Sequence, residues 1–125
     1  MDRNIRVSVE EGVVRVALRG EVAPSGGAKV MSLTGAAATQ AGSKLVLFDI
    51  TRARSRSYHA LAVEHARHAH ESGAIKYRIA ILGKPGDEKL SYFENVAINR
   101  GIRARSFTAE SDALAWLKRE RGGTV

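Results

Sequence analysis

The chain has 125 residues, contains no cysteine and carries a formal net charge of +7 at pH 7. Its length suits one domain over residues 1–125, and its 44% hydrophobic and 26% charged residues are typical of a soluble globular protein. The lack of cysteine excludes disulfide frameworks, thiol nucleophiles and zinc sites built on cysteine. No apolar run approaches the roughly 18 residues that span a bilayer, and the first residues lack the apolar stretch of a signal peptide, so we expect a cytoplasmic protein.

The first half of the chain predicts a hairpin, a helix and a central strand. Apolar and polar residues alternate over 5–9 and again from Val13 to Leu18, with a glycine-containing turn between the two runs. Small apolar residues over 28–41 favour a closely packed helix that ends near Gly42. The continuous apolar run over 44–50 is typical of a strand covered on both faces, and we place it at the centre of the sheet.

The second half alternates helices and strands. Helices are predicted over 57–72, 87–100 and 109–121, and strands over 77–82 and 103–107, with a frayed tail at 122–125. The resulting order is β-β-α-β-α-β-α-β-α. Because parallel neighbours need crossover connections, this order predicts an α/β domain with a mixed sheet: an N-terminal antiparallel hairpin, then parallel strands joined by right-handed crossover helices.

Two sequence features support a resemblance to a known family. A helix is predicted soon after Leu-Val-Leu-Phe-Asp49, and the closing segment 105–117 joins Phe107 to a helix that contains Trp116. With this order of elements, residues 5–117 resemble the SpoIIAA-like branch of the STAS superfamily. These bacterial proteins are related in fold to anti-sigma factor antagonists and, more loosely, to lipid-carrying Sec14-type domains. The resemblance implies a STAS-like domain from a branch whose function is largely undefined.

The resemblance also singles out one serine. Anti-sigma factor antagonists carry an Asp-Ser-Ser-Gly-like run before the second helix, in which a serine is phosphorylated to switch partner binding. The matching residues 54–59 here read Arg-Ser-Arg-Ser-Tyr-His, without an Asp-Ser pair and without glycine. Ser57 is therefore a candidate phosphorylation site only through its place at a helix N-terminus, and the simpler interpretation is that it caps the helix.

A basic mouth is predicted at the carboxyl ends of the parallel strands. Arginines alternate between the central strand and the helix that follows it, and the glycine-containing loop 83–86 leaves the next strand at the same end. Guanidinium groups and free N–H groups there favour an anion. The alternative is that these arginines are solvated surface charges. The candidate ligand-binding residues are Arg52, Arg54, Arg56, Ser57, Lys84 and Gly86.

The histidines of the helix predicted over 57–72 do not predict a metal site. His65 and His68 share a face, whereas His59 and His70 lie on the other flank. No aspartate or cysteine nearby completes a ligand set, so this helix offers at most two ligands. We predict no metal and no cofactor.

The predicted function is a non-enzymatic, regulatory module that binds a protein partner or a small anionic or amphipathic ligand at the carboxyl ends of its parallel strands. One alternative is a Sec14-like carrier of a lipid or another hydrophobic ligand. Another is a small hydrolase using Asp49, a loop serine and His59, although His59 and Ser57 diverge by about 200° on a helix and form no obvious pair, so no catalytic residue is predicted. No helix-turn-helix, RNP-like or zinc-finger pattern indicates a specific nucleic-acid partner, and a homodimer is left open.

Overall fold

The computed structural model describes residues 4–20, 26–54, 77–99 and 101–122. The helix predicted over 57–72, with its histidines and Ser57, lies outside these residues. The elements, in chain order, are β1 Ile5–Glu10, β2 Val13–Gly20, α1 Gly26–Ala41, β3 Leu45–Ala53, β4 Arg78–Leu82, α3 Glu88–Asn99, β5 Arg103–Phe107 and α4 Glu110–Gly122.

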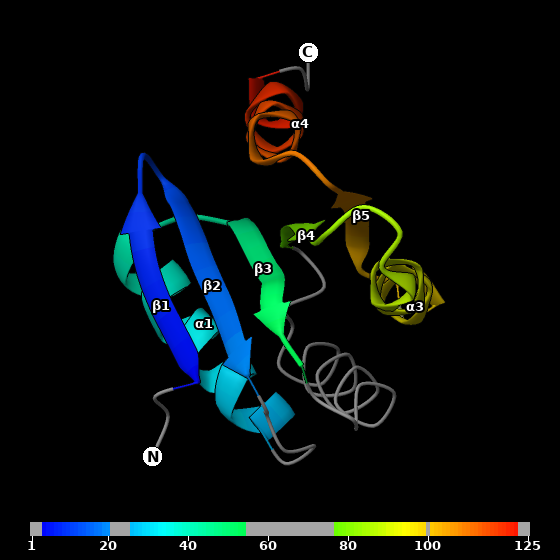
Figure 1. Ribbon diagram of the computed structural model, residues 1–125. Helices are drawn as coiled ribbons and strands as arrows, with labels where there is room; N and C mark the ends of the chain where they lie inside the picture. The colour runs from blue at the N-terminus through cyan, green and yellow to red at the C-terminus, as the bar shows by residue number, and fades with distance from the viewer. Residues whose placement is uncertain (1–3, 21–25, 55–76, 100, 123–125) are drawn as a thin grey trace.

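The strands form one mixed sheet in the order β1-β2-β3-β4-β5. β1 pairs with β2 in antiparallel fashion, and every later pair is parallel (Figure 1). The predicted α/β fold with an N-terminal hairpin and parallel strands is confirmed, and β3 occupies the centre of the sheet as expected.

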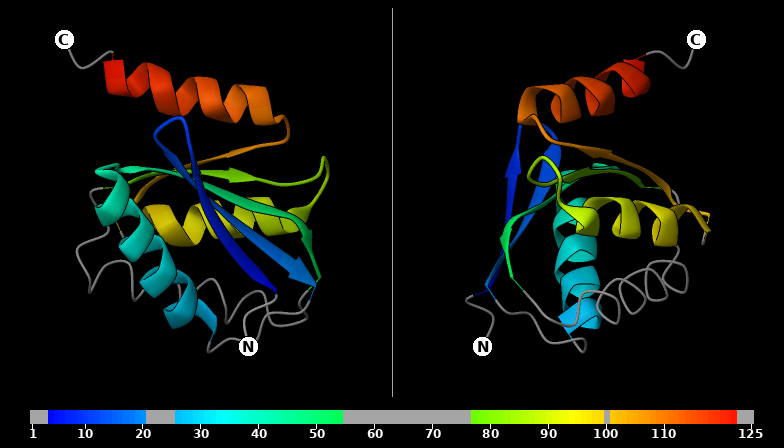
Figure 2. Two further views of the ribbon diagram at one scale, coloured as in Figure 1. Left: turned by 90° about the vertical axis from the view of Figure 1, so that its left-hand side faces the viewer. Right: turned by 45° about the vertical axis from the view of Figure 1, so that its right-hand side comes forward.

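Helices lie on both sides of this sheet. Figure 2 shows α4 on one side, with α1 and α3 on the other. The larger hydrophobic cluster lies on the α1 and α3 side, where Phe48 meets Phe93 of α3 edge to face with ring centroids 5.7 Å apart. Because side chains alternate along a strand, every second residue of the central strands enters this cluster. Those from β2 and β3 are Val14, Val16, Leu18, Val46, Phe48 and Ile50.

A smaller cluster lies between the sheet and α4. Leu47 of β3 and Leu117 of α4 are fully buried in it. Trp116 and Leu117 pack with Phe107 in this cluster, and the Phe107 and Trp116 ring centroids lie 5.7 Å apart. Trp116 is only half-buried, and the guanidinium group of Arg78 lies 4.3 Å from the centroid of its ring. α4 is therefore held by apolar burial and by a cation–π contact.

Several element boundaries differ from the sequence predictions by one to three residues. α1 begins at Gly26, two residues early, because a helical glycine costs only about 1 kcal/mol relative to alanine. β3 continues to Ala53, because its pairing with β2 resumes at Arg52 after a shift in register. α4 includes Gly122, which was expected to fray, and helix ends commonly vary by a residue or two. Residues 123–125 lie outside the described part.

The turn between β1 and β2 is a two-residue turn with positive φ at both positions. Glu11 has φ 52° and Gly12 has φ 79°. This geometry is that of a type I′ turn, which matches the twist of the two strands and favours Asn-Gly. Glu11 also accepts a hydrogen bond from the Lys118 ammonium group, 2.8 Å away on α4. The hairpin tip is therefore connected to α4.

Two substitutions of Glu11 distinguish the contribution of the turn to stability from that of the ion pair with Lys118. Glu11→Asn and Glu11→Gln both remove the carboxylate, but only asparagine readily adopts positive φ. We expect the Asn variant to be more stable than the Gln variant by about 0.5 to 1 kcal/mol in urea denaturation. Equal stabilities would contradict the turn assignment.

The ion pair also predicts a pH dependence. The hydrogen bond from Lys118, and then its charge, hold the pKa of Glu11 below its ordinary value. Because this pKa is lower in the folded than in the unfolded chain, the pair stabilises the fold above the unfolded-state pKa. The advantage of the wild type over Glu11→Gln should disappear as the pH falls through the lowered pKa.

Candidate functional site

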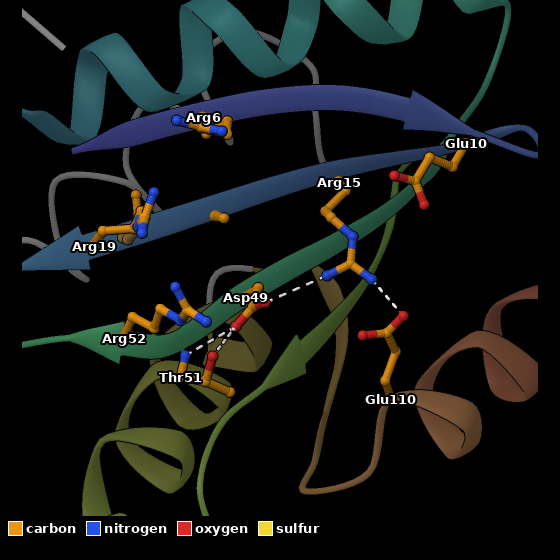
Figure 3. Close-up of a pocket in the computed structure, with 10 residues that line it drawn as sticks. Arg6, Glu10, Arg15, Arg19, Asp49, Thr51, Arg52 and Glu110 are labelled. Atoms are coloured by element: carbon orange, nitrogen blue, oxygen red, sulfur yellow. Dashed lines mark hydrogen bonds and ion pairs between the residues drawn. The ribbon is translucent and has the colours of Figure 1, made fainter. Parts of the chain in front are cut away.

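A polar cleft lies on the part of the sheet that α4 leaves uncovered. α4 packs against β3, β4 and β5, and the side chains facing it change from apolar to polar along β2 and β3. On β2, Val13 precedes Arg15, and on β3, Leu47 precedes Asp49. The cleft has a volume of about 420 Å³ (Figure 3). It is lined by Arg6, Glu10, Arg15, Ala17, Leu18, Arg19, Asp49, Thr51, Arg52 and Glu110.

The strand register explains why the sheet is hollow at this point. Ala17 of β2 pairs with Arg6 of β1 on one side and with Asp49 of β3 on the other. Along β2 it lies between Arg15 and Arg19 on the same face. The small side chain of Ala17 is therefore surrounded by four long or charged ones. Its methyl group forms the floor of the cleft, and the space above it is open.

Arg15 is neutralised by carboxylates from two other elements. One guanidinium nitrogen lies 3.3 Å from Asp49 Oδ2, and the other lies 2.5 Å from Glu110 Oε2 in the first turn of α4. The side chains of Arg15 and Asp49 are about one-fifth exposed, whereas that of Glu110 is half exposed. This network connects the centre of the sheet to α4 and leaves Arg15 with little net charge to offer a ligand.

Both oxygens of Asp49 are occupied. While Oδ2 contacts Arg15, Oδ1 accepts hydrogen bonds from the Thr51 backbone N–H at 2.9 Å and the Thr51 hydroxyl at 2.7 Å. The register between β2 and β3 shifts beside this turn, between Ala17 and Arg19. Asp49 thus stabilises the register shift in β3, and its hydrogen bonds with Thr51 position the residues that follow.

Three arginines gather at one end of the cleft. Arg19 and Arg52 are direct partners on β2 and β3, and Arg6 on β1 is diagonal to Arg19 because it pairs with Ala17. Figure 3 shows these three side chains together, away from Glu110. Within the described part of the chain, none of their guanidinium groups makes an ion pair. Like charges at paired strand positions destabilise the sheet, so this end of the cleft favours an anion.

Comparison with known proteins identifies the fold. No family model matches the chain, and no curated protein matches it either. A solved structure that does match is an uncharacterized protein of the DUF3478 family with a SpoIIAA-like fold, from Shewanella loihica PV-4. The TM-score is 0.63 at 20% sequence identity, and the match covers 90% of this chain and 91% of the other. The chain has a SpoIIAA-like fold. The resemblance drawn from the sequence is confirmed at the level of the fold.

In this SpoIIAA-like fold, the ligand-binding residues predicted from the sequence do not all line the cleft. Arg52 lines the cleft, but it lies within β3 and not in the loop after it. Arg54 is exposed, and its backbone N–H donates to the Gly20 carbonyl at 2.8 Å. Lys84 and Gly86 lie in the loop after β4, where a hydrogen bond from the Asp87 N–H to the Lys84 carbonyl closes a turn, and neither lines the cleft. Arg56 and Ser57 lie outside the described residues.

Most of the residues that line the cleft of this SpoIIAA-like fold were not predicted from the sequence. A signal was present in β2, where arginines occupy the positions that alternate with a buried apolar set. A charged face on a strand next to the central one indicates an open side of the sheet. The missed charged residues are Arg6, Glu10, Arg15, Arg19 and Glu110.

Among the described residues, no three side chains of histidine, aspartate or glutamate come together as ligands for a metal ion. No helix among those residues is long and apolar enough to cross a membrane.

Proposed function

We propose that this protein is a non-enzymatic, single-domain binding module of the bacterial cytoplasm that takes up a small anionic ligand in the cleft over Ala17, in a regulatory role. The observation that carries the proposal is the cluster of Arg6, Arg19 and Arg52, which brings three cationic side chains from three adjacent strands to one hollow. Arg19 and Arg52 belong to the last two residues of β2 and β3, so the cluster lies at the carboxyl ends of these strands.

The surroundings of Asp49 support binding more than hydrolysis. A catalytic aspartate in a hydrolase would orient a histidine, whereas the oxygens of Asp49 contact Arg15 and Thr51. The other members of the hydrolase alternative, His59 and a loop serine, lie outside the described residues.

The lining of the cleft supports a small anion more than a lipid. The cleft over Ala17 is open and lined mainly by charged side chains. A carrier needs a cavity lined predominantly by apolar side chains that encloses its ligand, and the cleft lacks such a lining. Capture of a lipid in the SpoIIAA-like fold would therefore need a different part of the molecule.

Thermal unfolding with inorganic phosphate tests the proposal. At about ten times its dissociation constant, phosphate should raise the melting temperature of the wild type by about 3 to 5 °C. Arg19→Gln and Arg52→Gln should each lose most of this rise. Because each variant also removes a like-charge pair, each should be slightly more stable than the wild type without phosphate.

Arg105→Gln is the matched control, because Arg105 is an exposed arginine of β5 whose guanidinium group lies 5.5 Å from the Phe107 ring centroid, outside the cleft. It should respond to phosphate as the wild type does. An equal loss in Arg105→Gln, or no response to phosphate or sulfate in the wild type, would overturn the proposal.

A further inference from the structure

The cleft has a second end of opposite charge. Glu10 of β1 lines the cleft and is exposed, and within the described part of the chain its carboxylate has no hydrogen-bond or ion-pair partner. Figure 3 shows Glu10 on the side of Arg15 away from Arg6, Arg19 and Arg52. Counting only partners in the described ranges, the cleft therefore has an unpaired carboxylate at one end and unpaired guanidinium groups at the other.

The strand fixes the spacing of these two ends. Arg6 and Glu10 are four residues apart on β1 and point to the same face, so their Cα atoms are separated by about 13 Å. Between them, Arg15 is held and neutralised by Asp49 and Glu110. The middle of the cleft therefore has one guanidinium group shared by two carboxylates, and the charged groups without an ion-pair partner among the described residues lie at its ends.

A second, smaller cavity extends from the acidic end of the cleft toward α4. It has a volume of about 200 Å³ and shares Glu10 and Arg15 with the cleft. In it, the Lys118 ammonium group already pairs with Glu11, so Glu10 is the carboxylate of this end that has no partner among the residues that the structure describes. Space for a cationic group is thus present beside the carboxylate that lacks a partner.

We propose that the ligand of this cleft is dipolar: a small molecule with a carboxylate or phosphate at one end and an ammonium group at the other, several bonds away. The anionic group binds Arg6, Arg19 and Arg52, and the ammonium group binds Glu10. This inference rests on the proposed function and adds a chemical class to the ligand. A simple anion uses only one end of the cleft, whereas a dipolar ligand of matching length neutralises both.

The test compares aminohexanoate, which carries a terminal ammonium group, with hexanoate and with adipate, which has a second carboxylate. Dissociation constants are measured with the intact protein by calorimetry. Aminohexanoate should bind about three- to fivefold more tightly than hexanoate, the gain of one exposed ion pair, and adipate should bind more weakly than aminohexanoate. Glu10→Gln should bring aminohexanoate and hexanoate to equal affinity.

Charge reversal provides the positive control. Glu10→Lys should make adipate the tighter ligand, whereas Asp112→Asn, which removes an exposed carboxylate of α4 outside the cleft, should leave the order unchanged. Equal affinities of aminohexanoate and hexanoate in a wild type that binds phosphate would overturn this inference and leave the proposed function standing. If phosphate also fails to bind, both are overturned.

Discussion

Replacing Leu117 by alanine is expected to lower the free energy of unfolding by about 3 kcal/mol, measured by chemical denaturation. Leu117 is fully buried and belongs to the smaller cluster, with Leu47 of the central strand and Ala113 one turn earlier on α4. The truncation would leave a cavity between α4 and the sheet, because the neighbouring side chains can relax only partly into the space. The loss should therefore be large for a single truncation.

Leu114→Ala is the matched control for Leu117. Leu114 lies on the same helix and carries the same side chain, but it is only partly buried and faces the hollow beside Lys118. Its truncation should cost about 1 kcal/mol, in proportion to the smaller apolar area that it removes from water. Similar losses in the two variants would contradict the described packing of α4.

Asp49→Ala is expected to lower the free energy of unfolding by about 2 to 3 kcal/mol. The substitution removes the acceptor of three hydrogen bonds, two from Thr51 and one from Arg15, and leaves their donors half-buried. It should also loosen the register shift between β2 and β3, and so displace Arg52.

Two milder variants separate the roles of Asp49. Thr51→Val removes one of the three hydrogen bonds and keeps a β-branched side chain, so it should cost about 1 kcal/mol. Asp49→Asn retains an acceptor oxygen for Thr51 but weakens the contact with Arg15, and its cost should lie between those of the other two variants. If Asp49→Ala were no less stable than Thr51→Val, the local role of Asp49 would be wrong.

Much of the fold could be predicted from the sequence because its signals are local. Alternation identified β1 and β2, and the turn residues Glu11 and Gly12 determine their pairing, which places Arg6 opposite Ala17. Glycine at positive φ ends α1 at Gly42, as its position after the helical pattern indicated. These features depend on residues close together in the chain.

The cleft could not be predicted in the same way because it depends on contacts between distant segments. Arg19 and Arg52 are partners in the parallel pairing of β2 with β3. These two strands are separated in the sequence by the whole of α1. The extension of β3 past Asp49 depends on the hydrogen bonds to Thr51 and on β2, and no local pattern marks it. The contact of Glu110 with Arg15 further requires that α4 lie across the sheet.

A titration of the isotope-labelled protein with phosphate, followed by NMR of its backbone amides, would show which residues surround a bound anion. We expect saturable shifts that are largest at Ala17, Arg19 and Arg52, with small shifts in the loop 83–86 and on β5. Largest shifts in the loop 83–86, or the absence of saturable shifts on β2 and β3, would contradict an anion site on the open face of this sheet.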